Sequence, residues 1–201
     1  MLLKIVQTGE PVLRQVGRTL TKKEILSPGI QQLIELMRET MRDAPGVGLA
    51  APQVGLPLQL AVIEDDDEYL RHMPKQRLEE QERKPVPFHV VVNPRVTVSD
   101  VTPVTHFEGC LSVAGFSALV PRSRGVKVEA LGHKGQPLTI DATGWYARIL
   151  QHEIDHLFGR LYVDRMLTRS FASNENQGRF LDGLPEEKLR ELVGPGQAPA
   201  E

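Results

Sequence analysis

Two histidines and a glutamate in one short segment could hold a metal ion and activate a water molecule. His152 and His156 are four residues apart, and Glu153 directly follows the first of them. Because residues four apart lie on one face of a helix, both imidazoles can reach one ion while Glu153 lies on the adjacent ridge. This spacing is typical of a metal-dependent hydrolase. The same pattern also fits a helix with two surface histidines, so the hypothesis needs a third ligand.

Cys110 is the only cysteine in the sequence and the candidate for that third ligand. A lone cysteine excludes an intrachain disulfide, which leaves either a small buried apolar residue or a site of chemistry. It lies in the segment Glu-Gly-Cys-Leu-Ser, where Gly109 allows a close approach of the backbone. One thiolate and two imidazoles suit Zn(II) or Fe(II), and a catalytic site keeps a fourth position open for water or substrate.

The histidine motif lies in a predicted helix over residues 143–158, which Gly159 would end. Trp145 and Ile149 fall on the same side as the two histidines. Tyr146, Leu150 and Leu157 form a neighbouring stripe that would seat the helix in the core.

The remaining elements predict an α+β fold, with strands in the middle of the chain and helices near both ends. A helix is expected over residues 28–43, with Ser27 as its N-cap and Pro28 in its first turn. Glycines make 46–55 a predicted loop, and charged residues make 65–87 an exposed insertion, with helical character near 76–83. Strands are predicted over 58–64, 88–93, 95–99, 117–121, 125–130, 138–142 and 161–163, with a short helix over 186–193 and a disordered tail after it.

Composition narrows the class of protein further. The 201 residues suggest one domain, and the formal charge of −2 gives no basic patch for nucleic acid or an anionic membrane. No apolar run approaches the roughly 18 residues that cross a bilayer, and the first residues lack the features of a secretory signal. We therefore expect a soluble protein, with the bacterial cytoplasm favoured and a processed organellar form left open.

Three segments together resemble the signature motifs of the peptide deformylases, in the same order along the chain: GVGLAAPQ at 46–53, EGCLS at 108–112 and QHEIDH at 151–156. The resemblance implies an α+β fold with mainly antiparallel sheets packed around a central helix that carries the HExxH motif. It also implies removal of the N-formyl group from the formylmethionine of new polypeptides, with release of formate. The matching region suggests a catalytic domain over 1–170 and a C-terminal extension, partly disordered, over 171–201.

The resemblance assigns a role to individual residues. Cys110, His152 and His156 would hold one divalent ion, favoured to be Fe(II), with Zn, Ni or Co possible, and Glu153 would be the general acid and base. The side chain of Gln53 and the backbone N–H of Leu111 would bind the oxyanion. The substrate main chain would pair with the rim at Gly46, Val47 and Gly48. The methionine side chain would need an apolar pocket near the metal, for which Val47, Gly109 and Ile149 are candidates by their position in the sequence.

Three charged residues near the motifs can be interpreted either as supports of the metal site or as ordinary surface charges. Glu108 and Arg122 could form an ion pair that fixes the Cys110 loop, or be unrelated surface charges. Asp155 could orient a ligand imidazole or be solvated. His72, His89, His106 and His133 show no ligand spacing and are treated as ordinary residues.

Two other functions remain open at this stage. A zinc endopeptidase shares the HExxH motif, although a cysteine ligand favours deformylation. A non-catalytic, metal-stabilised binding module would need a fourth protein ligand, for which the sequence offers no second cluster. The expected partners are formylmethionyl peptides and nascent chains, with a transient ribosome contact possible. No nucleic-acid motif and no membrane partner are expected.

Overall fold

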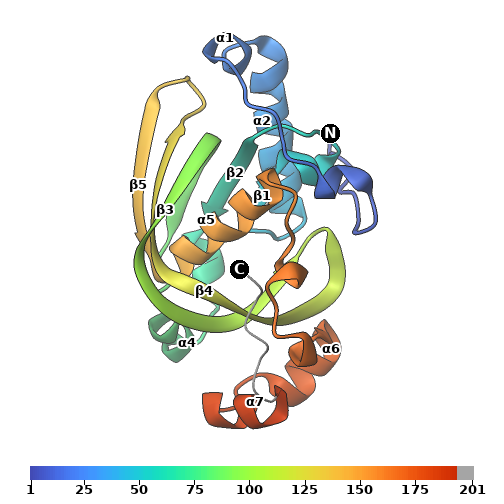
Figure 1. Ribbon diagram of the computed structural model, residues 1–201, viewed down its shortest axis with the longest axis vertical. Helices are drawn as coiled ribbons and strands as arrows, with labels where there is room; N and C mark the ends of the chain where they lie inside the picture. The colour runs from blue at the N-terminus through green and yellow to red at the C-terminus, as the bar shows by residue number, and fades with distance from the viewer. Residues whose placement is uncertain (194–201) are drawn as a thin grey trace.

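An antiparallel sheet that curves around one central helix forms the frame of the molecule (Figure 1). A computed structural model describes residues 1–193 of the chain. The strands follow the order β1-β2-β3-β4-β5, and the short β6 pairs with β4. Every pairing is antiparallel. This architecture confirms the predicted α+β class. The predicted tail after residue 193 lies outside the described residues.

The elements have the following bounds. The strands are β1 Gly48–Ala50, β2 Leu60–Asp65, β3 Val86–Cys110, β4 Val113–Leu131, β5 Pro137–Thr143 and β6 Ala172–Ser173. The helices are α1 Lys22–Ile25, α2 Pro28–Asp43, α3 Asp67–Leu70, α4 Lys75–Glu80, α5 Gly144–Leu157, α6 Asn174–Asn176 and α7 Glu186–Val193, joined by short 3-10 or π turns.

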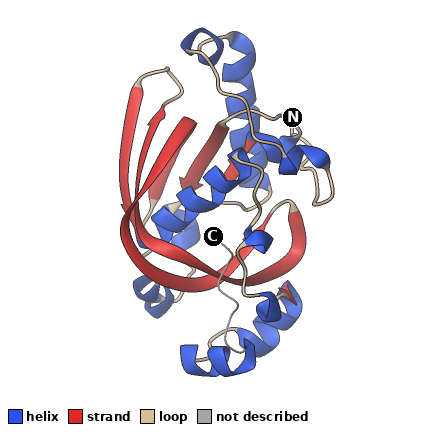
Figure 2. Cartoon of the chain, in the orientation of Figure 1, coloured by secondary structure: helices blue, strands red, loops and turns tan. Residues whose placement is uncertain are grey.

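Strands β3 and β4 form a long hairpin that wraps around α5 (Figures 1 and 2). Their register shifts at four places, between Val92 and Arg95, twice around Asp100, and between Gly109 and Cys110. Each irregularity bends the strand and increases its twist, which lets one hairpin cover two sides of a helix. The last shift lies directly beside Cys110, so the bulge sets the direction of the thiol.

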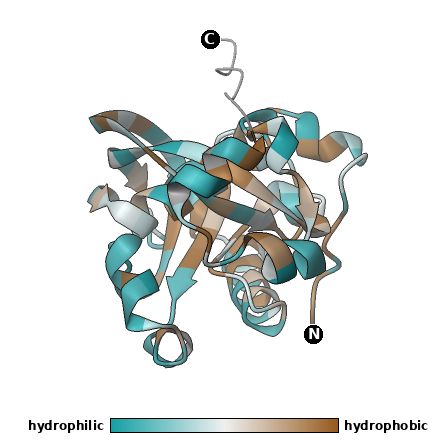
Figure 3. Cartoon of the chain, turned by 90° about the horizontal axis from the view of Figure 1, so that it is seen from below, coloured by the Kyte–Doolittle hydropathy of each residue, from teal (hydrophilic) through white to brown (hydrophobic). Residues whose placement is uncertain are grey.

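Helices α2 and α5 pack on the sheet through separate apolar clusters. Met37 and Met41 of α2 are fully buried against Leu60 and Val62 of β2. On α5, the predicted core stripe is present, since Leu150 packs with strands β4 and β5. Hydrophobic residues accordingly concentrate on the inner elements and hydrophilic residues on the outer helices (Figure 3). This packing holds α5 rigidly at the centre.

Several predicted boundaries were wrong. Strands expected over 88–93 and 95–99 are parts of β3, and those over 117–121 and 125–130 are parts of β4, because bulges bend the hairpin without ending it. The strand expected over 161–163 is a 3-10 turn, Tyr162–Asp164, whose Asp164 carboxylate accepts the N–H of Leu161. The predicted loop over 46–55 contains β1 and a 3-10 turn, Ala51–Val54, since β1 pairs with β2.

The predicted helix boundaries agree with the structure better than the predicted strand boundaries do. The helix over 28–43 is confirmed, with the Ile30 N–H donated to Ser27 Oγ, and so is the helix over 186–193. The insertion contains α3 and α4, somewhat earlier than the expected 76–83. Within residues 1–193, no helix combines the length and apolar character needed to span a membrane.

Candidate metal centre and active-site cleft

Cys110, His152 and His156 converge at the junction of β3 and α5. Their ligand atoms all lie within 4.8 Å of one another. Cys110 Sγ is 3.3 Å from His156 Nε2, and the two imidazole rings of α5 lie edge to face. A thiol and two imidazoles at this separation fit one divalent ion. Among the residues that the structure describes, no fourth His, Cys, Asp or Glu joins this cluster.

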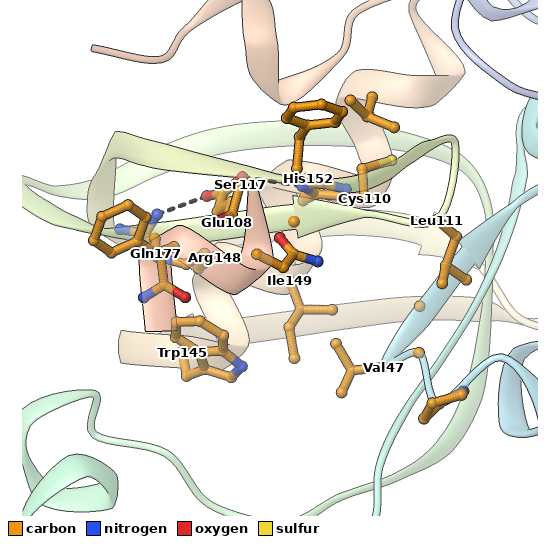
Figure 4. Close-up of a pocket in the computed structure, with 18 of the residues that line it drawn as sticks. Val47, Glu108, Cys110, Leu111, Ser117, Trp145, Arg148, Ile149, His152 and Gln177 are labelled. Carbon is orange, nitrogen blue, oxygen red and sulfur yellow. Dashed lines mark hydrogen bonds and ion pairs between the residues drawn. The ribbon is translucent and has the colours of Figure 1, made fainter. Parts of the chain in front are cut away.

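Glu108 fixes the orientation of His152. Its carboxylate accepts the N–H of His152 Nδ1 at 3.0 Å, which leaves Nε2 of that ring for the ion. The other contacts of Glu108 are ion pairs with Arg122, at 2.9 Å to each carboxylate oxygen, and with Arg148 at 2.6 Å (Figure 4). Although burial opposes ionisation, Arg122 and His152 hold the pKa of Glu108 well below its ordinary value. The predicted pair of Glu108 with Arg122 is therefore confirmed.

Asp155 is neither solvated nor bonded to a ligand imidazole. It is mostly buried and accepts hydrogen bonds from Arg122 and from Arg165, the latter at 2.7 and 2.8 Å. Arg122 thus links Glu108 on β3 to Asp155 on α5. Both interpretations offered for Asp155 are wrong, because its carboxylate is buried and bonded to Arg122 and Arg165, while Glu108 is the residue that contacts the His152 ring.

Glu153 is buried at the base of the cleft next to Gly48. A Cβ atom at Gly48 would lie 2.3 Å from Glu153 Oε1, so any other residue there would force the Glu153 side chain to move. Burial raises the pKa of Glu153 to about 7. Its Oε2 is buried and has no hydrogen-bond partner among the described residues. A carboxyl group that titrates near neutrality can both accept and donate a proton at working pH.

Gln53 and Leu111 lie next to the thiol of Cys110 in the cleft. The backbone N–H of Ala50 donates to Gln53 Oε1 at 2.9 Å, which turns Gln53 Nε2 toward Cys110 Sγ and Ser112 Oγ, at 3.4 Å each. The carbonyl of Leu111 accepts from Gln7 Nε2 at 2.9 Å. The amide of Gln53 is therefore held with its donor group facing the metal ligands.

A cleft of about 830 Å³ opens in front of these residues. It brings together every residue that the sequence proposed for substrate binding, namely Gly46, Val47, Gly48, Gly109 and Ile149. Figure 4 shows Ile149 in the centre of the cleft, with Trp145 and Gln177 on one side and Val47 and Leu111 on the other. Of the four histidines treated as ordinary, His72 also lines this cleft, whereas His89 pairs with Tyr146.

Sequence reasoning missed several cleft residues. Arg148 lies four residues before His152, and this helical spacing could have suggested that the two share the partner Glu108. His72 and Arg77 come from the insertion, and Asn174 and Gln177 come from the C-terminal extension. No local pattern marks these four residues, since only the tertiary fold brings their segments to the cleft.

Comparisons with known proteins agree with this geometry. The family model of polypeptide deformylases matches residues 2–171. The chain is 48% identical over 172 residues to peptide deformylase 1A, chloroplastic, of Solanum lycopersicum, with 86% of this chain and 62% of the relative covered. It is 45% identical to peptide deformylase 3 of Streptomyces avermitilis, with 92% and 80% covered.

A solved structure is similar as well. The Met-Ala-Ser-bound class I type b peptide deformylase from Acinetobacter baumannii superposes with a TM-score of 0.72 at 30% identity, covering 83% of this chain and 99% of that one. The chain is also 46% identical over 175 residues to peptide deformylase 1A, chloroplastic/mitochondrial, of Arabidopsis thaliana, with 87% of this chain covered. It spans less than two thirds of the length of the two plant relatives, 62% for the one from S. lycopersicum and 65% for the one from A. thaliana.

Proposed function

The chain belongs to the peptide deformylase family, and from this premise we propose that it removes the N-formyl group from the formylmethionine of newly synthesised polypeptides. The reaction adds water across the amide: the formyl C–N bond breaks, formate leaves, and the methionine amine takes up a proton. One observation carries the proposal. Cys110, His152 and His156, from segments far apart in sequence, meet beside a buried Glu153 at the base of an open cleft.

The three ligands would hold one divalent ion, for which we propose Fe(II), with Zn, Ni or Co as alternatives. The donor set fits each of these metals, because imidazole and thiolate bind all of them and availability decides occupancy. When bound, the ion supplies Lewis-acid activation of water and of the formyl carbonyl. Glu108 supports this role by fixing His152 so that Nε2 faces Cys110 and His156.

Glu153 moves the protons. Its carboxylate would take a proton from the attacking water and deliver it to the nitrogen of the departing amine. A pKa near 7 suits both transfers, and burial keeps bulk water away from the carboxylate. Gly48 leaves the space in which this side chain sits.

Gln53 and Leu111 stabilise the negative oxygen. The Nε2 amide of Gln53 would donate from one side and the backbone N–H of Leu111 from the other. The hydrogen bond from Ala50 N–H to Gln53 Oε1 orients this amide before substrate arrives, and a donor of this kind contributes roughly 3 to 4 kcal/mol to transition-state binding.

The substrate would enter as an extended chain along the rim of β1. Main-chain pairing with Gly46, Val47 and Gly48 tolerates any sequence, as an enzyme for many nascent chains requires. The methionine side chain would occupy the apolar part of the cleft at Val47, Gly109 and Ile149. The relative from A. baumannii was solved with Met-Ala-Ser bound, which has the sequence of a deformylated product.

Domain, partner and location assignments are part of the same proposal. We assign catalysis to residues 1–170 and treat 171–201 as an extension. A transient ribosome contact and a bacterial cytoplasmic location stay predictions, with an organellar form as the alternative that the chloroplastic and mitochondrial relatives favour.

The test is an anaerobic preparation with metal analysis and a formate-coupled assay. We expect formate from formyl-Met-Ala-Ser and no cleavage of internal peptide bonds in an unformylated peptide. Internal cleavage without formate release would indicate an endopeptidase instead. Bound metal without either activity would indicate a non-catalytic metal module.

A further inference from the structure

Two segments outside the three motifs form the mouth of the cleft. The insertion contributes His72 and Arg77, and the C-terminal extension contributes Asn174 and Gln177. An ion pair joins the two segments, because Arg77 Nη1 lies 3.6 Å from Asp182 Oδ2. We name these segments, residues 66–82 and 172–182, the two walls of the mouth. They are far apart in sequence, and this ion pair brings them together.

The insertion wall is firmly attached at its base. Asp65 and Arg83 form a buried bidentate ion pair at 2.8 and 2.9 Å, and the Arg83 guanidinium lies 4.8 Å from the centre of the Trp145 ring. The backbone N–H of Trp145 donates to the backbone carbonyl of Gln81 at 2.9 Å. The wall is therefore fixed to the first turn of α5, the helix that carries both histidine ligands.

The C-terminal wall is attached to strand β4. Strand β6 pairs with β4 through Phe116 and Ser173, and the Phe116 ring stacks on Phe171 at 5.0 Å. The hydroxyl of Ser170 accepts the N–H of Leu119 at 2.8 Å. These contacts place Asn174 and Gln177 on the cleft, as Figure 4 shows for Gln177 across from Leu111.

Arg77 differs from the other arginines that line the cleft. Arg83 and Arg148 are buried in close ion pairs, whereas Arg77 is half-exposed and makes a single long contact with an equally exposed Asp182. A lone exposed pair of this kind is weak, so another carboxylate can take the place of Asp182 at little cost. Arg77 is thus available to a ligand.

The direction of an extended peptide decides which of its residues meets Arg77. Alternate side chains of a strand point to the same face, so the first and third residues of the substrate share one face. With the methionine side chain against Val47 and Ile149, the third side chain would lie on the same face of the peptide two residues further along, in a cleft that Arg77 also lines. This step rests on the proposed function, which places formylmethionine in that pocket.

We propose that the two walls form a subsite for the third residue of the substrate, and that Arg77 makes this subsite favour an acidic side chain. An acidic third residue pairs with Arg77 and displaces Asp182. A lysine at that position meets like charge from Arg77. The walls therefore add a selectivity that the main-chain pairing along β1 does not supply.

The test compares formyl-Met-Ala-Glu-Ser with formyl-Met-Ala-Lys-Ser by the formate assay, using the metal-loaded full chain. We expect kcat/KM to be about fivefold higher for the glutamate peptide, the order that one exposed ion pair provides. Arg77→Glu should reverse this preference. Asp182→Ala should increase it, because Arg77 then has no competing carboxylate.

Arg71→Glu is the matched control. Arg71 is an exposed arginine of the same insertion that pairs with Asp67 and does not line the cleft. This variant changes net charge as Arg77→Glu does, and it should keep the wild-type preference. An unchanged preference in Arg77→Glu, or an equal reversal in Arg71→Glu, would overturn the subsite.

Two further measurements separate this inference from the proposed function. Formate release from formyl-Met-Ala-Ser by the wild-type protein tests the function alone. Calorimetric binding of the product peptides Met-Ala-Glu-Ser and Met-Ala-Lys-Ser tests the subsite without turnover. Turnover with equal binding of both peptides would reject only the subsite, whereas selective binding without formate release would reject only the deformylase function.

Discussion

The base of the cleft and its mouth hold their charged side chains in opposite ways. At the base, Glu108 is buried and contacts Arg122, Arg148 and His152 at once. At the mouth, Arg77 and Asp182 share one exposed contact of 3.6 Å. Several partners around one carboxylate leave it a single orientation, whereas one weak contact leaves both side chains free to exchange partners. The base is therefore suited to fixing metal ligands, and the mouth to adapting to different peptides.

Burial determines how much each arrangement matters for stability. Removing one member of a buried charge network leaves an unpaired charge in a medium of low dielectric constant, at a cost of several kcal/mol. Removing one member of an exposed pair costs less than about 1 kcal/mol, because water replaces the lost partner. Substitutions of charged residues at the base of the cleft should therefore lower the free energy of unfolding more than substitutions at its mouth.

The largest loss of activity is expected at Glu153, a buried carboxyl at the base for which the described residues provide no ion pair. Glu153→Gln keeps the shape of the side chain but cannot accept a proton, so kcat should fall by about 10³-fold. Metal content should stay at the wild-type level, since Cys110, His152 and His156 are unchanged. Formate release and metal analysis on the same sample check both statements, with Glu129→Gln on the exposed side of β4 as a control. Turnover near wild type with metal bound would exclude Glu153 as the acid and base.

A buried arginine should have the next largest effect. Arg122→Met leaves Glu108 and Asp155 each without one of their cationic partners, and we expect a loss of about 3 kcal/mol in the free energy of unfolding. Because Arg148 and Arg165 still contact these carboxylates, the loss should be at the lower end for a buried pair. Urea denaturation followed by circular dichroism measures it. A loss below 1 kcal/mol would mean that the network does not stabilise the fold as its burial suggests.

The space beside Glu153 gives a third test at the base. Gly48→Ala would place a Cβ 2.3 Å from Glu153 Oε1, so the carboxylate must move, and kcat/KM should fall by about 10²-fold. Gly29→Ala in α2 is the control, because its Cβ would meet no atom within 4 Å. The formate assay on both variants separates displacement of Glu153 from a general effect of alanine. Equal activity of the two variants would contradict the steric argument.

The base of the cleft could be predicted from the sequence better than the mouth. His152, Glu153 and His156 lie within one helical turn, so periodicity alone places them on α5. Cys110 could be added because it is the only thiol, and the resemblance of three motifs supplied Gln53 and Leu111. Each of these inferences rests either on residues that are close in sequence or on a family motif that contains the residue.

The mouth depends on contacts that no local pattern encodes. Arg77 and Asp182 meet because the insertion is fixed to Trp145 and the extension pairs with β4. The charges of the insertion suggested only a solvated surface. The strand boundaries failed for a different reason: near Asp100, whose carboxylate accepts the Thr102 N–H, the register of β3 and β4 shifts but the pairing continues, so turn-forming residues there bend the hairpin and do not end it.

The smallest effect is expected for the pair of Arg42 with Glu64, whose arginine is half-exposed and whose carboxylate keeps a second contact with Arg38 at 4.0 Å. Arg42 contacts both oxygens of Glu64 at 2.7 and 2.8 Å, closer than the 2.9 Å contacts of Arg122 with Glu108, yet half of its side chain is exposed. Arg42→Met should therefore cost less than about 1 kcal/mol in urea denaturation, and added salt should shrink the difference from wild type. If it cost as much as Arg122→Met, bond geometry and not burial would set the strength of these pairs, and the contrast between the base and the mouth of the cleft would lose its physical basis.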